Sequence, residues 1–224
     1  KKALKEFAVY ARNELRSQIK LRAKAFGITS EGLPELHIGD DYVEVNHKTY
    51  PKQQQKAFQT LFQHYNQKGF DQLIEEVAYT WFNRLIAIRF MEVHNYLPSR
   101  IRVLSSETPG KVDPDILTDY HRSGLPIKVE EITKLIQEGK SEEAYRRLLI
   151  AQCNELSEIM PFLFKKINGY TELLLPENLL HSDSIINTMN KQLDERDFEH
   201  VEVIGWLYQY YISEKKDEVF AGLR

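Results

Sequence analysis

The chain has 224 residues, enough for one large domain, and its 42% hydrophobic and 28% charged residues are typical of a globular protein and exclude wholesale disorder. Ten glycines and eight prolines are few for this length, which argues against a sandwich or barrel with many tight turns. The single cysteine, Cys153, excludes an internal disulfide and a cysteine-only metal site, and no apolar run is long enough to cross a bilayer. We therefore expect a cytoplasmic protein with no membrane partner.

Charge is distributed unevenly along the chain, although the net charge is only −3. Residues 1–26 contain eight basic and two acidic residues, a local charge of +6, so the rest of the chain carries −9. Residues 177–224 contain ten acidic and five basic residues, a local charge of −5. A basic beginning and an acidic end indicate an electrostatic footprint at one end of the molecule.

Residues 1–26 form a basic amphipathic segment, and the spacing predicts a helix over 2–26. Its apolar residues recur every three or four positions and so share one face: Leu4, Phe7, Ala8, Ala11, Leu15 and Ile19. Basic side chains along a helix can neutralise DNA phosphates and release counterions. The candidate DNA-binding residues are Arg12, Arg16, Lys20, Arg22 and Lys24. The alternative is a solvated basic face that binds nothing.

Residues 28–50 lack the repeated three- and four-residue spacing of apolar residues that predicts a helix. Residues 28–40 contain Gly32, Pro34 and Gly39 and are expected to form a loop. Residues 42–50 place β-forming side chains on both sides of the turn pair Asn46-His47, which predicts a β-hairpin. Pro51 fits the first position of a helix that would run to about residue 68.

Residues 70–95 give the strongest helical pattern. Apolar residues cover so much of the circumference that this helix is expected inside a bundle. Arg84 and Arg89 interrupt the apolar faces, and a buried guanidinium must be paired. We favour internal ion pairs, such as Arg89 with Glu92 at i, i+3, over an anion-binding site.

Shorter helices are expected in the remaining chain. Residues 99–112 are irregular, and short helices are expected at about 114–121 and 128–138. A longer helix is expected from Ser141 to about residue 159, and Pro161 interrupts it. Helices at about 184–193 and 197–212 come next, with a last one from Ser213. The sequence thus predicts a mainly α fold, a helical bundle with a minor β-hairpin near residues 42–50.

Catalytic motifs are scarce. The chain has no Gly-x-Gly pair, no P-loop and no paired histidines, so we assign no catalytic, cofactor-binding or metal-binding residue. Cys153 lies in a helical pattern and is expected to be an inert core thiol. The string from Glu214 to Lys216 matches the Glu-x-Lys of metal nucleases if residues 208–212 form a strand. The helical spacing of the aromatic residues in 206–211 favours a structural helix instead.

Three runs carry a resemblance to a known family. They are Ala3–Ala8 with Ala11–Leu15 (ALKEFA and ARNEL), Glu75–Glu92 (EEVAYTWFNRLIAIRFME) and Gly205–Lys216 (GWLYQYYISEKK). These runs resemble PglX proteins, the adenine-specific DNA methyltransferases of bacteriophage exclusion (BREX) systems. The resemblance spans nearly the whole chain in order.

The resemblance implies that this chain is one part of a longer enzyme. In PglX proteins a methyltransferase domain carries a glycine motif for S-adenosylmethionine and an Asn-Pro-Pro-Tyr motif for a flipped adenine, and neither occurs here. Residues 1–224 would be the non-catalytic N-terminal helical domain of a site-specific DNA adenine-N6 methyltransferase in phage defence, with residues 198–224 as the connector toward the catalytic domain. S-adenosylmethionine is expected in the parent protein and not in this chain.

The implied partners are double-stranded DNA, the protein's own C-terminal methyltransferase domain and other phage-defence proteins. Two alternatives to a DNA-contacting domain remain. The first is a helical protein–protein docking module without nucleic-acid contact. The second is a nuclease that depends on Glu214 and Lys216.

Overall fold

The computed structural model describes residues 2–165 and 169–223, and within them the fold is mainly α-helical with one small sheet. The predicted fold class, a helical bundle with a minor β-hairpin, is confirmed. The elements in chain order are α1 (Lys2–Ala25), β1 (Leu36–Ile38), β2 (Tyr42–Val45), β3 (Lys48–Pro51), the 3₁₀ turn η1 (Lys52–Gln54), α2 (Gln55–Lys68), α3 (Phe70–Val93), α4 (Ile116–Asp119), η2 (Tyr120–Arg122), α5 (Val129–Gln137), α6 (Ser141–Leu156), α7 (Pro161–Phe164), α8 (Tyr170–Leu173), α9 (Ile185–Gln192), η3 (Glu195–Phe198) and α10 (Glu202–Gly222).

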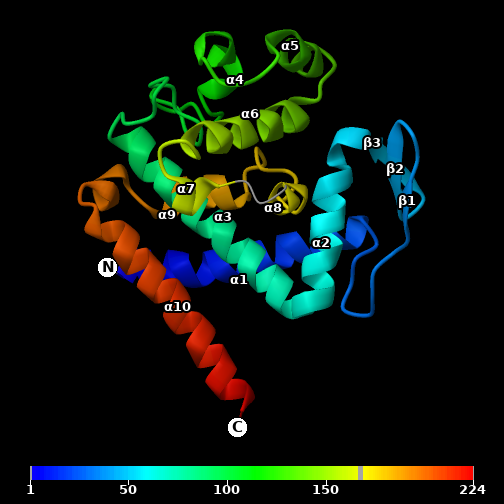
Figure 1. Ribbon diagram of the computed structural model, residues 1–224. Helices are drawn as coiled ribbons and strands as arrows, with labels where there is room; N and C mark the ends of the chain where they lie inside the picture. The colour runs from blue at the N-terminus through cyan, green and yellow to red at the C-terminus, as the bar shows by residue number, and fades with distance from the viewer. Residues whose placement is uncertain (1, 166–168, 224) are drawn as a thin grey trace.

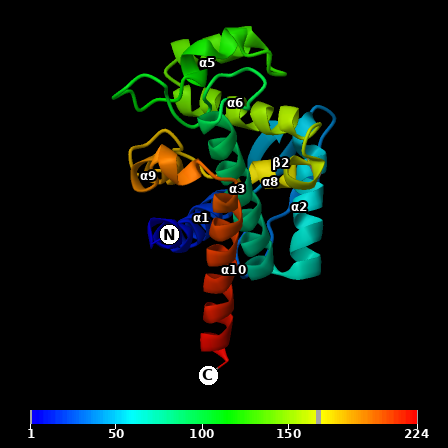
Figure 2. The same ribbon diagram turned by 90° about the vertical axis from the view of Figure 1, so that its left-hand side faces the viewer.

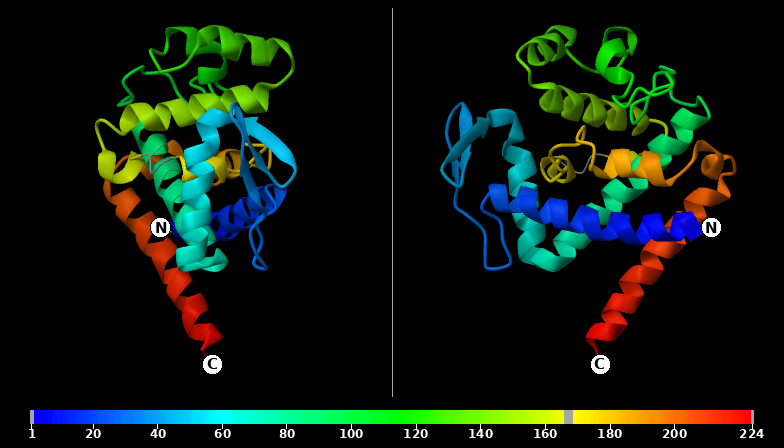
Figure 3. Two further views of the ribbon diagram at one scale, coloured as in Figure 1. Left: turned by 45° about the vertical axis from the view of Figure 1, so that its right-hand side comes forward. Right: turned by 180° about the vertical axis from the view of Figure 1, so that it is seen from behind.

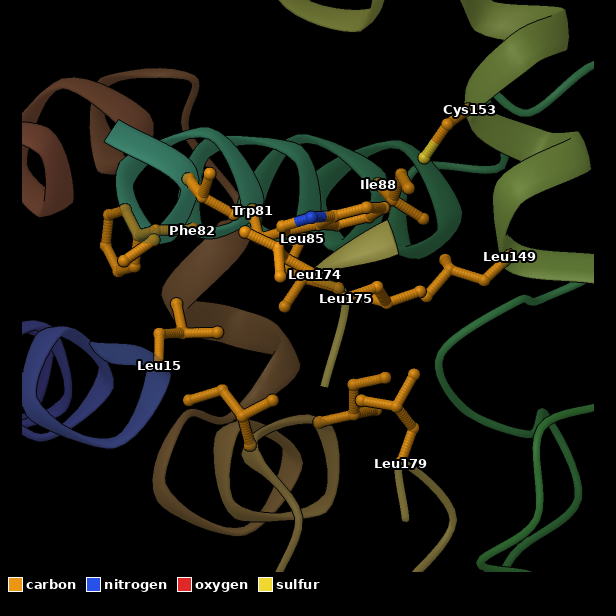
Figure 4. Close-up of a cluster of buried hydrophobic side chains, with 14 of the residues drawn as sticks. Leu15, Trp81, Phe82, Leu85, Ile88, Leu149, Cys153, Leu174, Leu175 and Leu179 are labelled. Carbon is orange, nitrogen blue, oxygen red and sulfur yellow. The ribbon is translucent and has the colours of Figure 1, made fainter. Parts of the chain in front are cut away.

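Helix α3 lies at the centre of the bundle, as its apolar circumference predicts. It contacts α1, α2, α7 and α10, and α6 lies above it in Figure 1. Trp81 is fully buried, and its indole Nε1 donates a hydrogen bond to the Thr171 carbonyl oxygen at 2.8 Å. Figure 4 shows Trp81 and Leu85 among aliphatic side chains from α6 and the segment after α8. A helix buried on most sides needs such partners on most sides.

Helices α1 and α10 cross on one side of α3. The buried residues of α1 are the predicted apolar stripe together with Arg12 and Ala23. The buried residues of α10 end at Tyr211, although the helix continues to Gly222. Its second half therefore projects from the bundle, as Figures 1 and 2 show.

The sheet has three antiparallel strands in the order β1-β2-β3. The predicted hairpin is confirmed, and Asn46 and His47 at its tip have φ of 51° and 65°. Two successive positive φ angles are those of a type I′ turn, whose twist matches a two-residue hairpin. The prediction of a plain loop over residues 28–40 is wrong at its end, because Leu36–Ile38 pairs with β2 as β1.

Three predicted helix starts also differ from the structure. The helix expected over 197–212 begins only at Glu202, because residues 195–198 form the separate 3₁₀ turn η3. Pro51 ends β3, and the helix after it begins as the 3₁₀ turn η1 before α2 starts at Gln55. Ser213 does not start a last helix, because α10 runs through it without a break. Either Asp183 or Ser184 fits the sequence as the cap of α9, and the structure has Ser184, which accepts a hydrogen bond from the Asn187 backbone N–H at 3.1 Å.

No helix in the described parts of the chain is long and apolar enough to span a membrane.

Candidate nucleic-acid interface

The structure divides the five predicted DNA-binding residues into two groups, although all five lie on α1. Arg12, Arg16 and Arg22 make ion pairs with acidic residues outside α1. Lys20 and Lys24 are exposed, and neither has an ion-pair or hydrogen-bond partner in the described structure. Figure 3 shows α1 running along the rear face of the molecule, where its outer side is open.

Arg12 is the most buried of the five and belongs to a cluster of four charges. Its side chain is only 2% exposed, and it binds Glu75 of α3 through two hydrogen bonds, Nε to Oε1 at 3.0 Å and Nη2 to Oε2 at 3.2 Å. Its third donor, Nη1, bonds to the Glu218 carboxylate of α10. Arg16 lies 3.0 Å from Glu75 Oε2 and donates to Glu218 Oε2 at 3.2 Å. The four residues, which we call the α1–α10 charge cluster, thus connect three helices.

The charges in this cluster shift the pKa of two of its members. Burial acts to lower the pKa of Arg12, but the hydrogen bond to Glu218 and the charge of Glu75 together outweigh burial and raise it. The Arg12 hydrogen bond lowers the pKa of Glu218, and the charge of Arg16 adds to this effect. Arg12 and Glu218 are therefore both charged near neutral pH.

Arg22 faces a different region. It donates to the Leu173 carbonyl oxygen at 3.0 Å, pairs with Glu177, and its guanidinium lies 4.7 Å from the centre of the Phe26 ring. It borders an open groove of about 850 Å³ between α1, α2 and the α5–α6 pair. The charged residues lining this groove are Arg22, Lys134, Arg146 and Arg147 with Glu131, Glu138, Glu143 and Glu172. Equal numbers of bases and acids give the groove no preference for a polyanion.

The two arginines inside α3 bind groups of the chain itself, but only Arg89 forms an ion pair among the described residues, so the predicted internal ion pair is wrong for Arg84. Arg84 donates to the carbonyl oxygens of Leu163 and Lys165, both at 3.2 Å, and its guanidinium carbon lies 5.2 Å from the centre of the Trp81 ring. It therefore ties α3 to α7 and leaves no anion site there.

Arg89 forms the predicted pair with Glu92, at 3.9 Å. Glu92 is completely buried and accepts hydrogen bonds from the Leu104 backbone N–H and the Ser105 hydroxyl. Burial raises its pKa to about 7 despite Arg89. This pair fixes the irregular segment after α3 to the bundle.

The structure groups no reactive thiol or metal-binding side chains into a site among the described residues. Cys153 is buried, and burial raises the pKa of its thiol to about 12, which keeps it protonated and unreactive. Across residues 2–165 and 169–223, no three histidine, cysteine or acidic side chains are grouped so that they could hold a metal ion.

The nuclease interpretation loses its structural basis. It requires residues 208–212 to form a strand, and these residues lie in the middle of α10. Glu214 and Lys216 are on the same helix, and the acidic strand residue that would precede them is missing from this region of the structure.

The projecting half of α10 exposes apolar side chains. Val219 is 54% exposed, Phe220 61% and Leu223 79%. Contiguous exposed apolar surface of this kind usually marks an interface. These three side chains are therefore largely uncovered by the residues that the structure describes.

The acidic partners of Arg12 and Arg16 cannot be predicted from the sequence. Glu75 is 63 residues from Arg12 along the chain, and Glu218 is 206 residues away. One local signal is present: Arg12 follows Ala11 and lies about one turn from Ala8 and Leu15, so it borders the apolar stripe of α1. A basic residue at such a border is a candidate for an internal pair.

Comparison with known proteins identifies relatives. The chain is 39% identical, over 96% of its length, to the adenine-specific methyltransferase BrxX of Escherichia coli O9:H4 (strain HS), and 37% identical, over 98% of its length, to the adenine-specific methyltransferase PglX of Lacticaseibacillus casei (strain Zhang). The chain spans 19% and 20% of the length of these curated relatives. No protein-family model matches it. The resemblance to PglX proteins is therefore confirmed: this chain is a homologue of a region that makes up about one fifth of the BrxX and PglX adenine-specific methyltransferases.

Proposed function

We propose that residues 1–224 form the non-catalytic N-terminal helical domain of an S-adenosylmethionine-dependent, site-specific DNA adenine-N6 methyltransferase of bacterial phage defence. The observation that carries this proposal is the similarity of almost the whole chain to two adenine-specific methyltransferases, in a chain without a glycine loop for the cofactor. The parent enzyme would extrude an adenine from cytoplasmic double-stranded DNA and methylate its exocyclic amine. Methyl transfer would take place outside this domain, whose role is to hold DNA and the catalytic domain.

DNA contact would use the outer side of α1. Lys20 and Lys24 are one turn apart and exposed, so their ammonium groups are free to approach phosphates. Arg12 is unsuitable for a charge-reversal test, because a carboxylate in its place would lie buried against Glu75 and destabilise the fold. Substitution of the two exposed lysines therefore tests DNA binding without changing the stability of the fold.

The reversal Lys20→Glu with Lys24→Glu is expected to weaken binding to duplex DNA roughly tenfold and to lower the slope of log K against log salt by about 2, because two phosphate contacts are lost. Fluorescence anisotropy at several salt concentrations measures both quantities. The matched control is Lys134→Glu with Lys140→Glu, which changes the net charge equally at two exposed lysines on the α5–α6 side of the molecule. If the two double variants bind alike, Lys20 and Lys24 are not DNA contacts. If neither the native chain nor any variant binds DNA, the docking-module alternative is favoured.

The second proposed role is to pack on the methyltransferase domain through residues 198–224. The projecting half of α10 carries the exposed apolar residues, and a long helix holds the next part of a chain in a fixed direction. Other phage-defence proteins are further proposed partners of the same surface.

Amide hydrogen exchange tests this packing role. In the isolated domain, residues 213–223 are expected to exchange at least tenfold faster than residues 203–211, which hold the buried side of α10. In the full-length enzyme residues 213–223 are expected to become protected, while the buried half of α1 stays unchanged as the internal control. Equal and strong protection of residues 213–223 in both proteins would show that this end belongs to the bundle alone.

A further inference from the structure

The α1–α10 charge cluster contains one acid that is fixed and one that is not. Glu75 is 13% exposed and lies within α3, at the centre of the bundle. Glu218 is 50% exposed and lies on the projecting half of α10. Beyond residue 212, Glu218 is the only described residue of α10 whose side chain makes a hydrogen bond or ion pair with another element. Its carboxylate is therefore the one member of the cluster that can leave while the others stay.

Removal of that carboxylate leaves a site shaped for an anion. A single oxygen, Glu218 Oε2, accepts hydrogen bonds from both Arg12 Nη1 and Arg16 Nη1. The two arginines and Glu75 alone carry a net charge of +1, so the site without Glu218 lacks one negative charge. Guanidinium groups that converge on one oxygen are a common arrangement for binding phosphate.

A further donor without a partner in the described structure lies on the same side of α10 as Glu218, two turns earlier. Tyr211 is fully buried, and its hydroxyl has no hydrogen-bond partner among the described residues. Burial raises the pKa of this hydroxyl, and the charges of Glu75, Arg12 and Arg16 act on it as well. An unpaired buried hydroxyl is unfavourable unless something else binds it. The Glu218 carboxylate leaves this hydroxyl without a hydrogen bond. A phosphate group has more acceptor oxygens than a carboxylate, so it can bind the two arginines and the hydroxyl together.

We propose that Arg12, Arg16 and Tyr211 form a phosphate-binding site that Glu218 occupies in this structure, and that a phosphate group exchanges with the Glu218 carboxylate. This inference rests on the proposed function for its physiological ligand, a phosphate of the DNA backbone. When phosphate occupies the site, the projecting half of α10 loses its one polar tie to the bundle within the described structure. DNA binding and the direction of α10 are therefore coupled.

The test compares the native chain with Glu218→Gln, using inorganic phosphate as the probe in calorimetric titrations at constant ionic strength. Because Glu218→Gln removes the internal competitor, it is expected to bind phosphate at least tenfold more tightly than the native chain. Glu214→Gln is the matched control, since it makes the same change of charge on the same helix at a residue that does not contact the arginines. Adding Arg16→Gln to Glu218→Gln is expected to abolish the gain. Circular dichroism checks that each variant is folded.

Equal phosphate affinity of Glu218→Gln and Glu214→Gln would overturn the inference, as would a gain that persists after Arg16→Gln. The same titrations with a short duplex distinguish the source of the phosphate. Tighter binding of both ligands by Glu218→Gln supports the site and its DNA ligand. Tighter binding of inorganic phosphate alone supports the site for a free phosphate group and overturns the DNA backbone as its ligand. Duplex binding that depends on Lys20 and Lys24 and is unchanged by Glu218→Gln keeps the proposed function and shows that DNA does not use this site.

Discussion

Replacement of Arg89 by alanine is expected to destabilise the domain by about 3–5 kcal/mol at pH 8, because it leaves the Glu92 carboxylate buried without its partner. Glu92 is completely buried, and its remaining contacts are hydrogen bonds from Leu104 and Ser105. Urea unfolding followed by circular dichroism measures the free energy of unfolding. Arg147→Ala is the control, since this arginine is 45% exposed, and it should change stability by less than about 1 kcal/mol.

The loss from Arg89→Ala is expected to shrink as the pH falls below 7. Burial raises the pKa of Glu92 from 4.5 to about 7, so between these values the folded state binds more protons than the unfolded state and stability falls as pH rises. The charge of Arg89 lowers this pKa, so the Glu92 carboxyl of Arg89→Ala stays protonated to a higher pH. At low pH Glu92 is protonated with or without Arg89, and the difference in stability between the two proteins is then smaller. Adding Glu92→Gln should restore most of the lost stability at pH 8. A loss that is the same at pH 5.5 and pH 8 would argue that packing, and not charge, is responsible.

Replacement of Trp81 by alanine is expected to cost about 3–5 kcal/mol, the range for removing a large aromatic side chain from a packed core. Trp81 is fully buried in the cluster shown in Figure 4, and its loss also leaves the Thr171 carbonyl oxygen without its 2.8 Å hydrogen bond. The measurement is again urea unfolding, or the melting temperature where the variant is still folded at room temperature.

Phe162→Ala is the matched control for Trp81→Ala, because it removes an aromatic side chain that is 87% exposed. Its effect on stability is expected to be within about 0.5 kcal/mol. If Trp81→Ala cost no more than Phe162→Ala, the centre of the core would not lie at α3.

Local periodicity predicts the long elements of this fold. The apolar stripe of α1 and the nearly continuous apolar circumference of α3 depend on residues three and four positions apart, so they are visible in any short window. Strand β1 has only three residues, and its pairing with β2 joins segments that a periodicity argument treats separately. The continuity of α10 through Ser213 is not evident from the sequence, because serine is also a common helix cap.

The candidate site is predictable only in part, for a physical reason. A helical wheel places Arg12, Arg16 and Lys20 in one row, but it cannot show that Glu218 of α10 binds Arg12 and Arg16 while Lys20 stays exposed. Burial and pairing are properties of three helices together. The predicted pairing of Arg89 with Glu92 is confirmed because both residues lie about one turn apart on the same helix.

The unbroken course of α10 has a consequence for the length of the chain in related proteins. The alignment with the Lacticaseibacillus casei relative covers 246 positions, more than the 224 residues here, so insertions separate these sequences. One residue inserted between Tyr211 and Glu218 would turn everything beyond it by about 100° and advance it by about 1.5 Å. Glu218 would then point away from Arg12, and the exposed apolar residues would face another direction. We therefore expect related chains to keep the spacing from Tyr211 to Glu218 and to place their insertions elsewhere, for example in the exposed loop at residues 108–113.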